Sequence, residues 1–125
     1  MSALDLAATY LALNGVGVAT PLPGADFMER LGHCPQDMAW LVGVYPQTSD
    51  WPHWEMHPNG HELLVMLEGR MEITLDRAGT ISKVILEAGG EALLVPPGAW
   101  HVAKVLEPGR MFGLTYGEGT QHRPL

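Results

Sequence analysis

Apolar and polar positions along the chain form short runs, and most of these runs predict β-strands. Runs of apolar or β-branched residues separated by Gly, Pro, Asn and Asp are typical of strands in an antiparallel sheet. The pattern predicts eight strands, at Met38–Tyr45, Trp54–His57, Glu62–Leu67, Met71–Asp76, Ile81–Glu87, Ala92–Val95, Trp100–Leu106 and Met111–Tyr116. Strands at this spacing indicate an all-β sandwich or barrel. Periodicity alone does not choose among immunoglobulin-like, lipocalin-like and jelly-roll topologies.

Turn residues punctuate these strands. Glu68-Gly69-Arg70 reads as the tip of a hairpin, and Arg77–Thr80 as the turn before the next strand. Pro96-Pro97-Gly98 ends a strand, and Pro108-Gly109 separates the last predicted pair. Gly15-Val16-Gly17 lacks the third glycine of a dinucleotide-binding loop and therefore predicts a simple turn.

Three segments lie outside the predicted strands. Ser2 is a suitable N-cap for a short N-terminal helix over Ala3–Leu13, which Asn14-Gly15 would end. Its apolar face would consist of Leu4, Ala7, Ala8 and Leu11. Asp26–Leu31 is long enough for one more helical turn, and the tail Gly117–Leu125 is polar and reads as irregular.

Length and charge restrict the class of protein. The 125 residues suit a single domain over residues 1–125, and 7 basic against 14 acidic residues give a net charge of −7. This charge makes nucleic acid and anionic membranes unlikely partners. A single cysteine, Cys34, excludes an internal disulfide, and the N-terminus resembles neither a signal peptide nor a membrane span. We therefore expect a soluble, cytoplasmic protein.

The candidate chemistry is concentrated between Trp54 and Glu62. Glu55 and His57 are two residues apart on a strand, so their side chains point the same way. A turn follows, and Glu62 opens the next strand, where it can face back toward the pair. His101 starts another strand and supplies a fourth candidate ligand. Imidazole nitrogens and carboxylate oxygens suit Zn²⁺, Fe²⁺, Mn²⁺, Ni²⁺ or Cu²⁺.

Two motifs in this region resemble those of the cupin superfamily. The first is Glu55-x-His57, four residues, Glu62, six residues, Gly69, within residues 49–69. The second is Gly90, five residues, Pro96-Pro97-Gly98, two residues, His101, within residues 90–105. The resemblance implies a single-domain jelly-roll β-barrel. Residues 54–62 together with the tail over residues 119–124 resemble small single-domain bacterial cupins (conserved barrel), a group that indicates no particular substrate.

The resemblance also implies a ligand set. His57, Glu62 and His101 match the family's metal ligands, and Glu55 stands where the family has its first histidine. The sequence departs from the motifs at Ser49 and Val105 as well. We expect one divalent transition metal (Zn, Fe, Mn or Ni) on these four side chains. The alternatives are a metal-free, hydrogen-bonded cluster, and a three-ligand site in which Glu55 orients a histidine.

Further residues are candidates for a substrate pocket. Leu64 and Met66 share a face with Glu62 and would line the barrel interior. Other pocket candidates are Trp54, His122 and Arg123, the last two through a tail that closes over the barrel. His61 and Glu55 are candidates for a general base if they do not bind the metal, whereas Cys34 reads as an inert thiol. Trp100 points away from His101 and suits a subunit interface.

Three functions follow from these residues. The first is a metal-dependent enzyme acting on a small polar metabolite by isomerisation, hydrolysis or dioxygenation. The second is a non-catalytic module that binds a small ligand. The third is a metal-free barrel that acts through its dimer surface. Only 17% of the residues are charged and four are tryptophan, which favours a homodimer.

Overall fold

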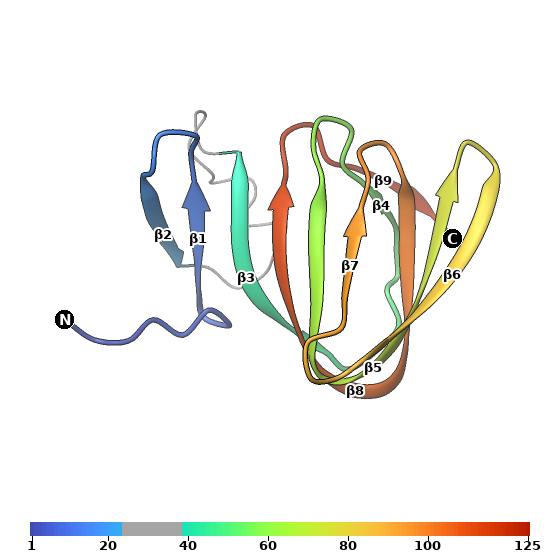
Figure 1. Ribbon diagram of the computed structural model, residues 1–125, viewed down its shortest axis with the longest axis horizontal. Helices are drawn as coiled ribbons and strands as arrows, with labels where there is room; N and C mark the ends of the chain where they lie inside the picture. The colour runs from blue at the N-terminus through green and yellow to red at the C-terminus, as the bar shows by residue number, and fades with distance from the viewer. Residues whose placement is uncertain (24–38) are drawn as a thin grey trace.

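The structure, a computed structural model, describes residues 1–23 and 39–125, and it is built from antiparallel strands (Figure 1). These residues contain no helix, and so none long and apolar enough to cross a membrane. The described strands are β1 Thr9–Leu13, β2 Ala19–Pro23, β3 Trp40–Gln47, β4 His53–Met56, β5 Glu62–Arg77, β6 Thr80–Glu87, β7 Ala92–Val95, β8 Trp100–Tyr116 and β9 Gln121–Pro124. The all-β prediction is confirmed.

Two long strands, β5 and β8, organise the sheet. They pair with each other along nearly their whole length, and each runs through both halves of the curled sheet (Figure 1). In one half β3 pairs with β8 and β7 pairs with β5, while in the other half β6 pairs with β5 and β4 pairs with β8. β9 lies against β4, and β1 and β2 extend the sheet beyond β3. The two halves face each other and enclose the interior.

The predicted hairpin at Glu68-Gly69-Arg70 and the predicted break at Pro108-Gly109 are both wrong. Both segments lie inside the continuous strands β5 and β8, which bend together there with three register shifts between Met66 and Met71. Gly69 has a φ of 83°, which a residue with a Cβ rarely adopts. A Cβ on Gly109 would overlap the Glu68 carbonyl oxygen. These turn-type residues therefore permit a paired bend instead of a chain reversal.

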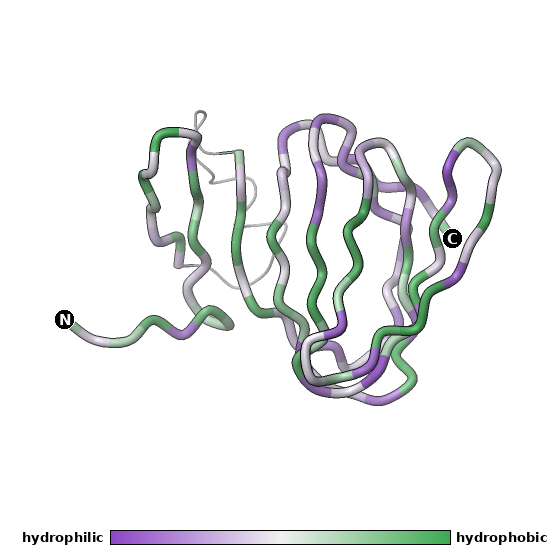
Figure 2. Tube along the Cα trace, viewed as in Figure 1, coloured by the Kyte–Doolittle hydropathy of each residue, from purple (hydrophilic) through white to green (hydrophobic). Residues whose placement is uncertain are grey.

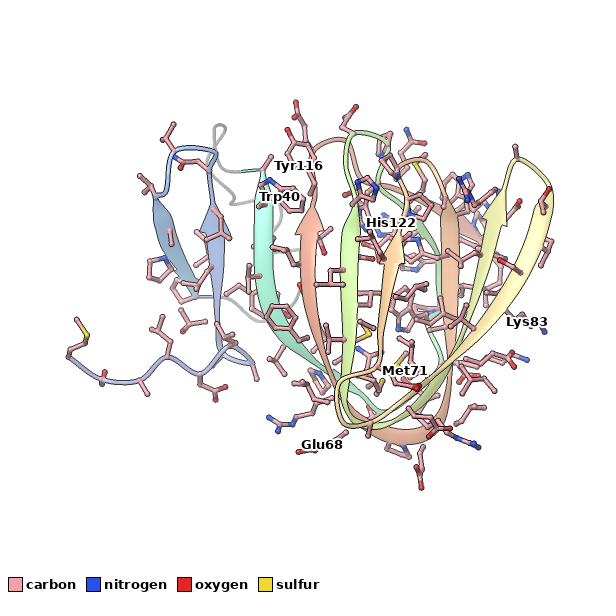
Figure 3. All side chains as sticks on the ribbon, in the orientation of Figure 1. Trp40, Glu68, Met71, Lys83, Tyr116 and His122 are labelled. Carbon is pink, nitrogen blue, oxygen red and sulfur yellow. The ribbon has the colours of Figure 1, made fainter. Side chains whose placement is uncertain are left out.

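Alternation along β5 builds the core. Its buried side chains recur at every second residue in each half of the strand, and apolar and polar segments alternate along the trace in Figure 2. Figure 3 shows Met71 between the strands, whereas Glu68 and Lys83 lie at the periphery. The core residues of β5 are Leu64, Met66, Met71, Ile73 and Leu75.

Both ends of the chain differ from the prediction. The N-terminal helix over Ala3–Leu13 is wrong, because residues 6–8 make a single turn and β1 follows with Tyr10 and Ala12 buried. Pairing with β2 and β3 outweighs the helical spacing of the apolar residues. The irregular tail is also wrong, since β9 pairs with β4. Asp26–Leu31 and Cys34 lie outside the described residues.

Candidate metal centre

Three strands bring the four predicted ligands together in the barrel interior. Glu55 lies in β4 and is paired directly with His101 of β8, and His57 follows β4. Glu62 is the first residue of β5 and is paired with Thr115. His57, Glu62 and His101 are buried, and Glu55 is nearly so. The site therefore depends on strand pairings between residues far apart in the sequence.

Glu55, His57 and His101 form a group of donor atoms that could hold a metal ion. Each offers one ligand atom, and these atoms lie within 4.8 Å of one another. His57 Nε2 is 3.6 Å from Glu55 Oε1, and the two imidazole rings are 5.4 Å apart between centroids. Two nitrogens and one oxygen in such a group are suited to a divalent transition metal.

Glu62 lies between the two histidines. Its Oε1 accepts a hydrogen bond from His101 Nε2 at 2.9 Å, and its Oε2 accepts one from the Thr115 hydroxyl. The same Oε2 is 3.2 Å from His57 Nε2. Glu62 thus contacts both imidazoles and lies directly beside the three-residue group, although it is not one of the three.

Hydrogen bonds on the outer sides of the imidazoles fix their tautomers. The Thr120 hydroxyl donates to the Gly117 carbonyl, so its oxygen accepts from His57 Nδ1–H, at 2.8 Å in each case. His101 Nδ1 is 3.1 Å from the Ala99 carbonyl, which can only accept. Each Nδ1 therefore carries a proton, and each Nε2 faces the cluster. His101 Nε2 also carries a proton where it donates to Glu62, and a bound metal would take the place of that proton. A protonated Nδ1 with Nε2 turned inward is the arrangement that metal-binding histidines adopt.

Two buried atoms test whether the cluster fits a metal. Glu55 Oε1 and His57 Nε2 are fully buried and have no hydrogen-bond partner among the described residues. A buried polar atom without a partner costs about 1–3 kcal/mol. A cation between them would satisfy both atoms together. The donor set and these two atoms therefore fit a divalent cation held by Glu55, His57 and His101, with Glu62 beside them.

The cluster also changes the acidity of its members. Burial raises the pKa of Glu55 to about 7, and the charge of Glu62 adds to the effect. Burial acts in the same direction on Glu62, but the hydrogen bond from His101 and the close approach of the His57 imidazole outweigh it and hold the pKa of Glu62 well below its usual range. Burial opposes protonation of His101, yet the hydrogen bond to Glu62 leaves its pKa raised. The metal-free cluster is therefore built around an ionised Glu62 paired with His101.

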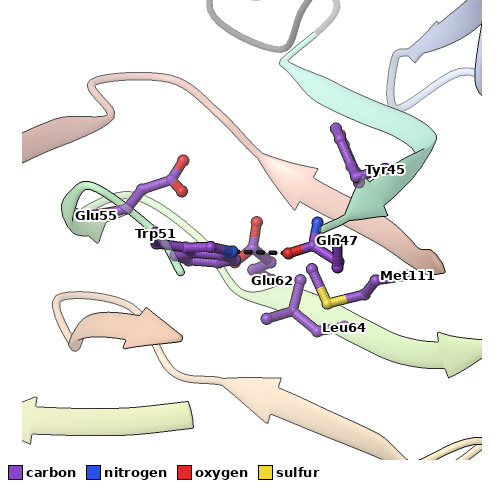
Figure 4. A pocket seen from close by; sticks show the side chains of 7 residues that line it. All are labelled: Tyr45, Gln47, Trp51, Glu55, Glu62, Leu64 and Met111. Atoms are coloured by element: carbon purple, nitrogen blue, oxygen red, sulfur yellow. Dashed lines mark hydrogen bonds between the residues drawn. The ribbon is translucent and has the colours of Figure 1, made fainter. Parts of the chain in front are cut away.

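A cavity of about 150 Å³ adjoins the cluster (Figure 4). Leu64, a predicted pocket residue, lines it, whereas Met66 is completely buried in the core. The full lining consists of Tyr45, Gln47, Trp51, Glu55, Glu62, Leu64 and Met111. The cavity thus shares two carboxylates with the cluster, and Trp51, Leu64 and Met111 give it apolar walls beside the polar groups of Tyr45 and Gln47.

β9 places His122 and Arg123 near the cluster. His122 Nε2 is 4.0 Å from Glu55 Oε1, and its ring packs edge-on against His53 at 4.6 Å. Figure 3 shows His122 between the strands.

Arg123 makes a different set of contacts. Its guanidinium lies over the rings of Trp54 and Trp100, at 4.8 and 4.6 Å, and donates to Asp76 Oδ2 at 2.8 Å. Arg123 thus contacts residues of its own chain and covers one face of the Trp100 ring. These contacts also connect β9 to β5 and β8.

Several site residues were missed in the sequence. Thr115 and Thr120 carry no local signal, because their roles depend on which histidine or carboxylate the fold places beside them. Tyr45 and Gln47 lie on β3, whereas the sequence predicts a strand that ends at Tyr45 and gives neither residue a role. His61, a candidate base, is exposed, and no hydrogen bond or ion pair joins its side chain to the cluster among the described residues.

A comparison with protein-family models finds a cupin domain over residues 40–115, which is more than half of the chain. The chain is a cupin. The match includes every residue of the two cupin motifs, and the strand arrangement agrees with the jelly-roll expectation. The comparison with curated proteins finds no match.

Solved structures share the cupin's fold at low identity. One is oxalate decarboxylase of Bacillus subtilis with Mn(II) centres, at 16% identity and a TM-score of 0.59, over 84% of this chain and 28% of that chain. Another is Fe(II) HppE in complex with substrate, at 16% identity and a TM-score of 0.51, over 62% of this chain and 42% of that chain. Hydroquinone 1,2-dioxygenase of Sphingomonas sp. TTNP3 matches at 13% identity and a TM-score of 0.51, over 62% of this chain and 59% of that chain. This chain spans between 24% and 60% of the neighbours' lengths.

Proposed function

We propose that this cupin is a metal-dependent enzyme that acts on a small polar metabolite. The observation that carries the proposal is the pair of buried atoms without hydrogen-bond partners, Glu55 Oε1 and His57 Nε2. Glu55 also lines a cavity. A purely structural cluster gains nothing by leaving two buried polar atoms without hydrogen bonds. The proposal covers isomerisation, hydrolysis and dioxygenation.

The four side chains have distinct parts in this proposal. Glu55, His57 and His101 would hold the ion, and Glu62 would complete the set while it keeps its hydrogen bond from Thr115. When bound, a divalent metal supplies a Lewis acid for a carbonyl or activates water or O₂. Neighbours of the same fold support this use of the barrel, since they include an Fe(II) protein with substrate, an oxalate decarboxylase with Mn(II) centres and a dioxygenase.

The chain's own residues prepare the site in two ways. The hydrogen bonds at each Nδ1 hold the two imidazoles with Nε2 toward the cluster before any ligand arrives. Trp51, Leu64 and Met111 form apolar walls beside the carboxylates. Apolar surroundings strengthen the charge interactions next to them.

The test combines metal content with turnover. We would purify the protein without an affinity tag, measure bound metals by mass spectrometry, and reload the protein separately with Fe²⁺, Mn²⁺, Ni²⁺ and Zn²⁺. Each form is then incubated with a metabolite extract, whose components are followed by liquid chromatography and mass spectrometry. We expect at least one compound to be consumed with one metal by the wild type and by the exposed-residue control Lys104→Ala.

The variants His57→Ala and His101→Ala should bind little metal and consume nothing while circular dichroism shows a retained fold. Metal binding without consumption of any compound would instead indicate a non-catalytic binding module. A wild type that binds no metal in any of these conditions would contradict the proposal.

A further inference from the structure

One polar side chain in the cavity, Gln47, has its hydrogen-bonding role fixed by a neighbour. Its Oε1 accepts a hydrogen bond from Trp51 Nε1 at 2.8 Å (Figure 4). An indole N–H can only donate, so the amide oxygen must face Trp51 and the amide NH₂ is left for other partners. Gln47 is buried and lines the cavity, and no described residue accepts a hydrogen bond from this NH₂.

The rest of the cavity sets the size and polarity of a ligand. Trp51, Leu64 and Met111 present apolar surface, which favours an apolar body over a highly hydroxylated one. A volume of about 150 Å³ is comparable to cavities that hold a benzene-sized molecule. The ligand is therefore small, with room for roughly one ring and a short substituent.

The charges in the cavity argue for a neutral ligand. Glu55 and Glu62 both line it, and no Lys or Arg does. Without a cation these carboxylates repel an anion. With a divalent cation bound as proposed above, two carboxylates offset its charge, so no positive charge is left over for an anionic ligand. Gln47 is then the group that selects for a hydrogen-bond acceptor.

We infer that the cavity binds a neutral small organic molecule with an apolar body and a carbonyl-type oxygen, and that the Gln47 NH₂ donates to this oxygen. The inference deepens the proposed function, on which it rests, by limiting the polar part of the metabolite to a neutral carbonyl-type oxygen carried on an apolar body. Gln47 is the specificity-determining residue, and Trp51 positions it through the indole hydrogen bond.

The test uses two probes of nearly equal shape. Acetophenone carries a C=O where 2-phenylpropene carries C=CH₂, so the ratio of their dissociation constants isolates the acceptor. Both are titrated by NMR into metal-free protein, which makes the result independent of metal binding. The variants are Gln47→Met, which removes the amide, and Gln47→Glu, which keeps an acceptor for Trp51 and removes the donor. Gln121→Met, at an exposed position, is the matched control.

We expect the preference for acetophenone over 2-phenylpropene to fall by about fivefold in both Gln47 variants, as for the loss of one neutral hydrogen bond. The ratio should stay unchanged in Gln121→Met, and the Gln47 side-chain amide resonance should shift on titration with acetophenone. Benzoate, an anionic probe of similar size, should bind more weakly than acetophenone.

Three results would overturn the inference: an unchanged ratio in both Gln47 variants, no binding of acetophenone to the wild type, or tighter binding of benzoate. Failure of the proposed function has a different signature, namely absence of metal in the elemental analysis. A loss of metal binding with the acetophenone result intact would remove the enzyme proposal and leave the ligand class standing.

Discussion

His57 Nδ1 and Thr120 Oγ1 lie 2.8 Å apart although 63 positions separate them in the sequence. The bond joins the residue after β4 to the loop before β9, and the Gly117 carbonyl holds the hydroxyl hydrogen on its other side. The direction of this hydrogen bond sets which ring nitrogen of His57 faces the cluster. The C-terminal segment is therefore part of the candidate metal centre.

Replacing Thr120 should weaken metal binding without unfolding the protein. Thr120→Val keeps the shape of the side chain but removes the acceptor of His57 Nδ1–H. We expect zinc affinity to fall by about 10- to 100-fold, as is usual when the partner of a ligating histidine is lost. Competition against a chromophoric chelator measures the affinity. Thr120→Ser and the exposed Thr48→Val should keep wild-type affinity, and equal affinities in all four proteins would contradict this role.

Removal of the Glu62 charge should destabilise the metal-free protein. Glu62→Gln leaves His101 buried without its anionic partner, and breaking a buried ion pair from one side costs about 3 kcal/mol or more. Urea denaturation of chelator-treated protein measures the free energy of unfolding. The exposed Glu107→Gln serves as the control and should leave the urea midpoint unchanged. An unchanged midpoint in Glu62→Gln as well would show that the charge pair is not stabilising.

A methyl group at the shared bend of β5 and β8 should destabilise the fold. Gly109→Ala forces its Cβ against the Glu68 carbonyl oxygen, so the two strands must separate or shift. We expect a loss of about 2 kcal/mol, typical of overpacking. Gly15→Ala is the matched control, because its Cβ would meet nothing within 4 Å. Equal thermal midpoints for the two variants would contradict the close approach at the bend.

The Asp76–Arg123 pair should give a pH-dependent contribution to stability. Arg123, and then the Gly79 N–H, hydrogen-bond to Asp76 and hold the pKa of its carboxyl below the usual value. A lowered pKa means that the stabilisation is complete above the ordinary pKa of about 4 and is lost as the pH falls through the lower, folded value. The difference in thermal midpoint between wild type and Asp76→Asn should therefore be constant from about pH 5 to 7 and shrink below about pH 4. A difference that grows on acidification would contradict this sign.

Local pattern predicted most strands and the four side chains that meet in the cluster, because each strand and each motif is marked by short spacings. Ala92–Val95 has the predicted bounds, and His57 and Glu62 flank a turn that the sequence marks with Pro and Gly. The errors occur where distant pairing decides. Gly69 and Gly109 read as turn residues, yet each lies in a strand whose partner bends with it.

The same reason explains what was missed at the site. Gln47 and Thr120 belong to segments without any ligand-like spacing, and only the folded sheet brings them to the cavity and to His57. The helical spacing of the N-terminal apolar residues was misleading because β1 buries alternate residues against β2 and β3. Non-local strand pairing outweighs local periodicity in both regions.

Anomalous X-ray diffraction from crystals grown with one equivalent of Zn²⁺, recorded on both sides of the zinc absorption edge, tests the central claim most directly. The account predicts one strong interior peak about 2.0–2.2 Å from Glu55, His57 Nε2 and His101 Nε2, and none in crystals of His101→Ala. A peak only at the protein surface, or an interior peak that the His101→Ala substitution leaves in place, would contradict it.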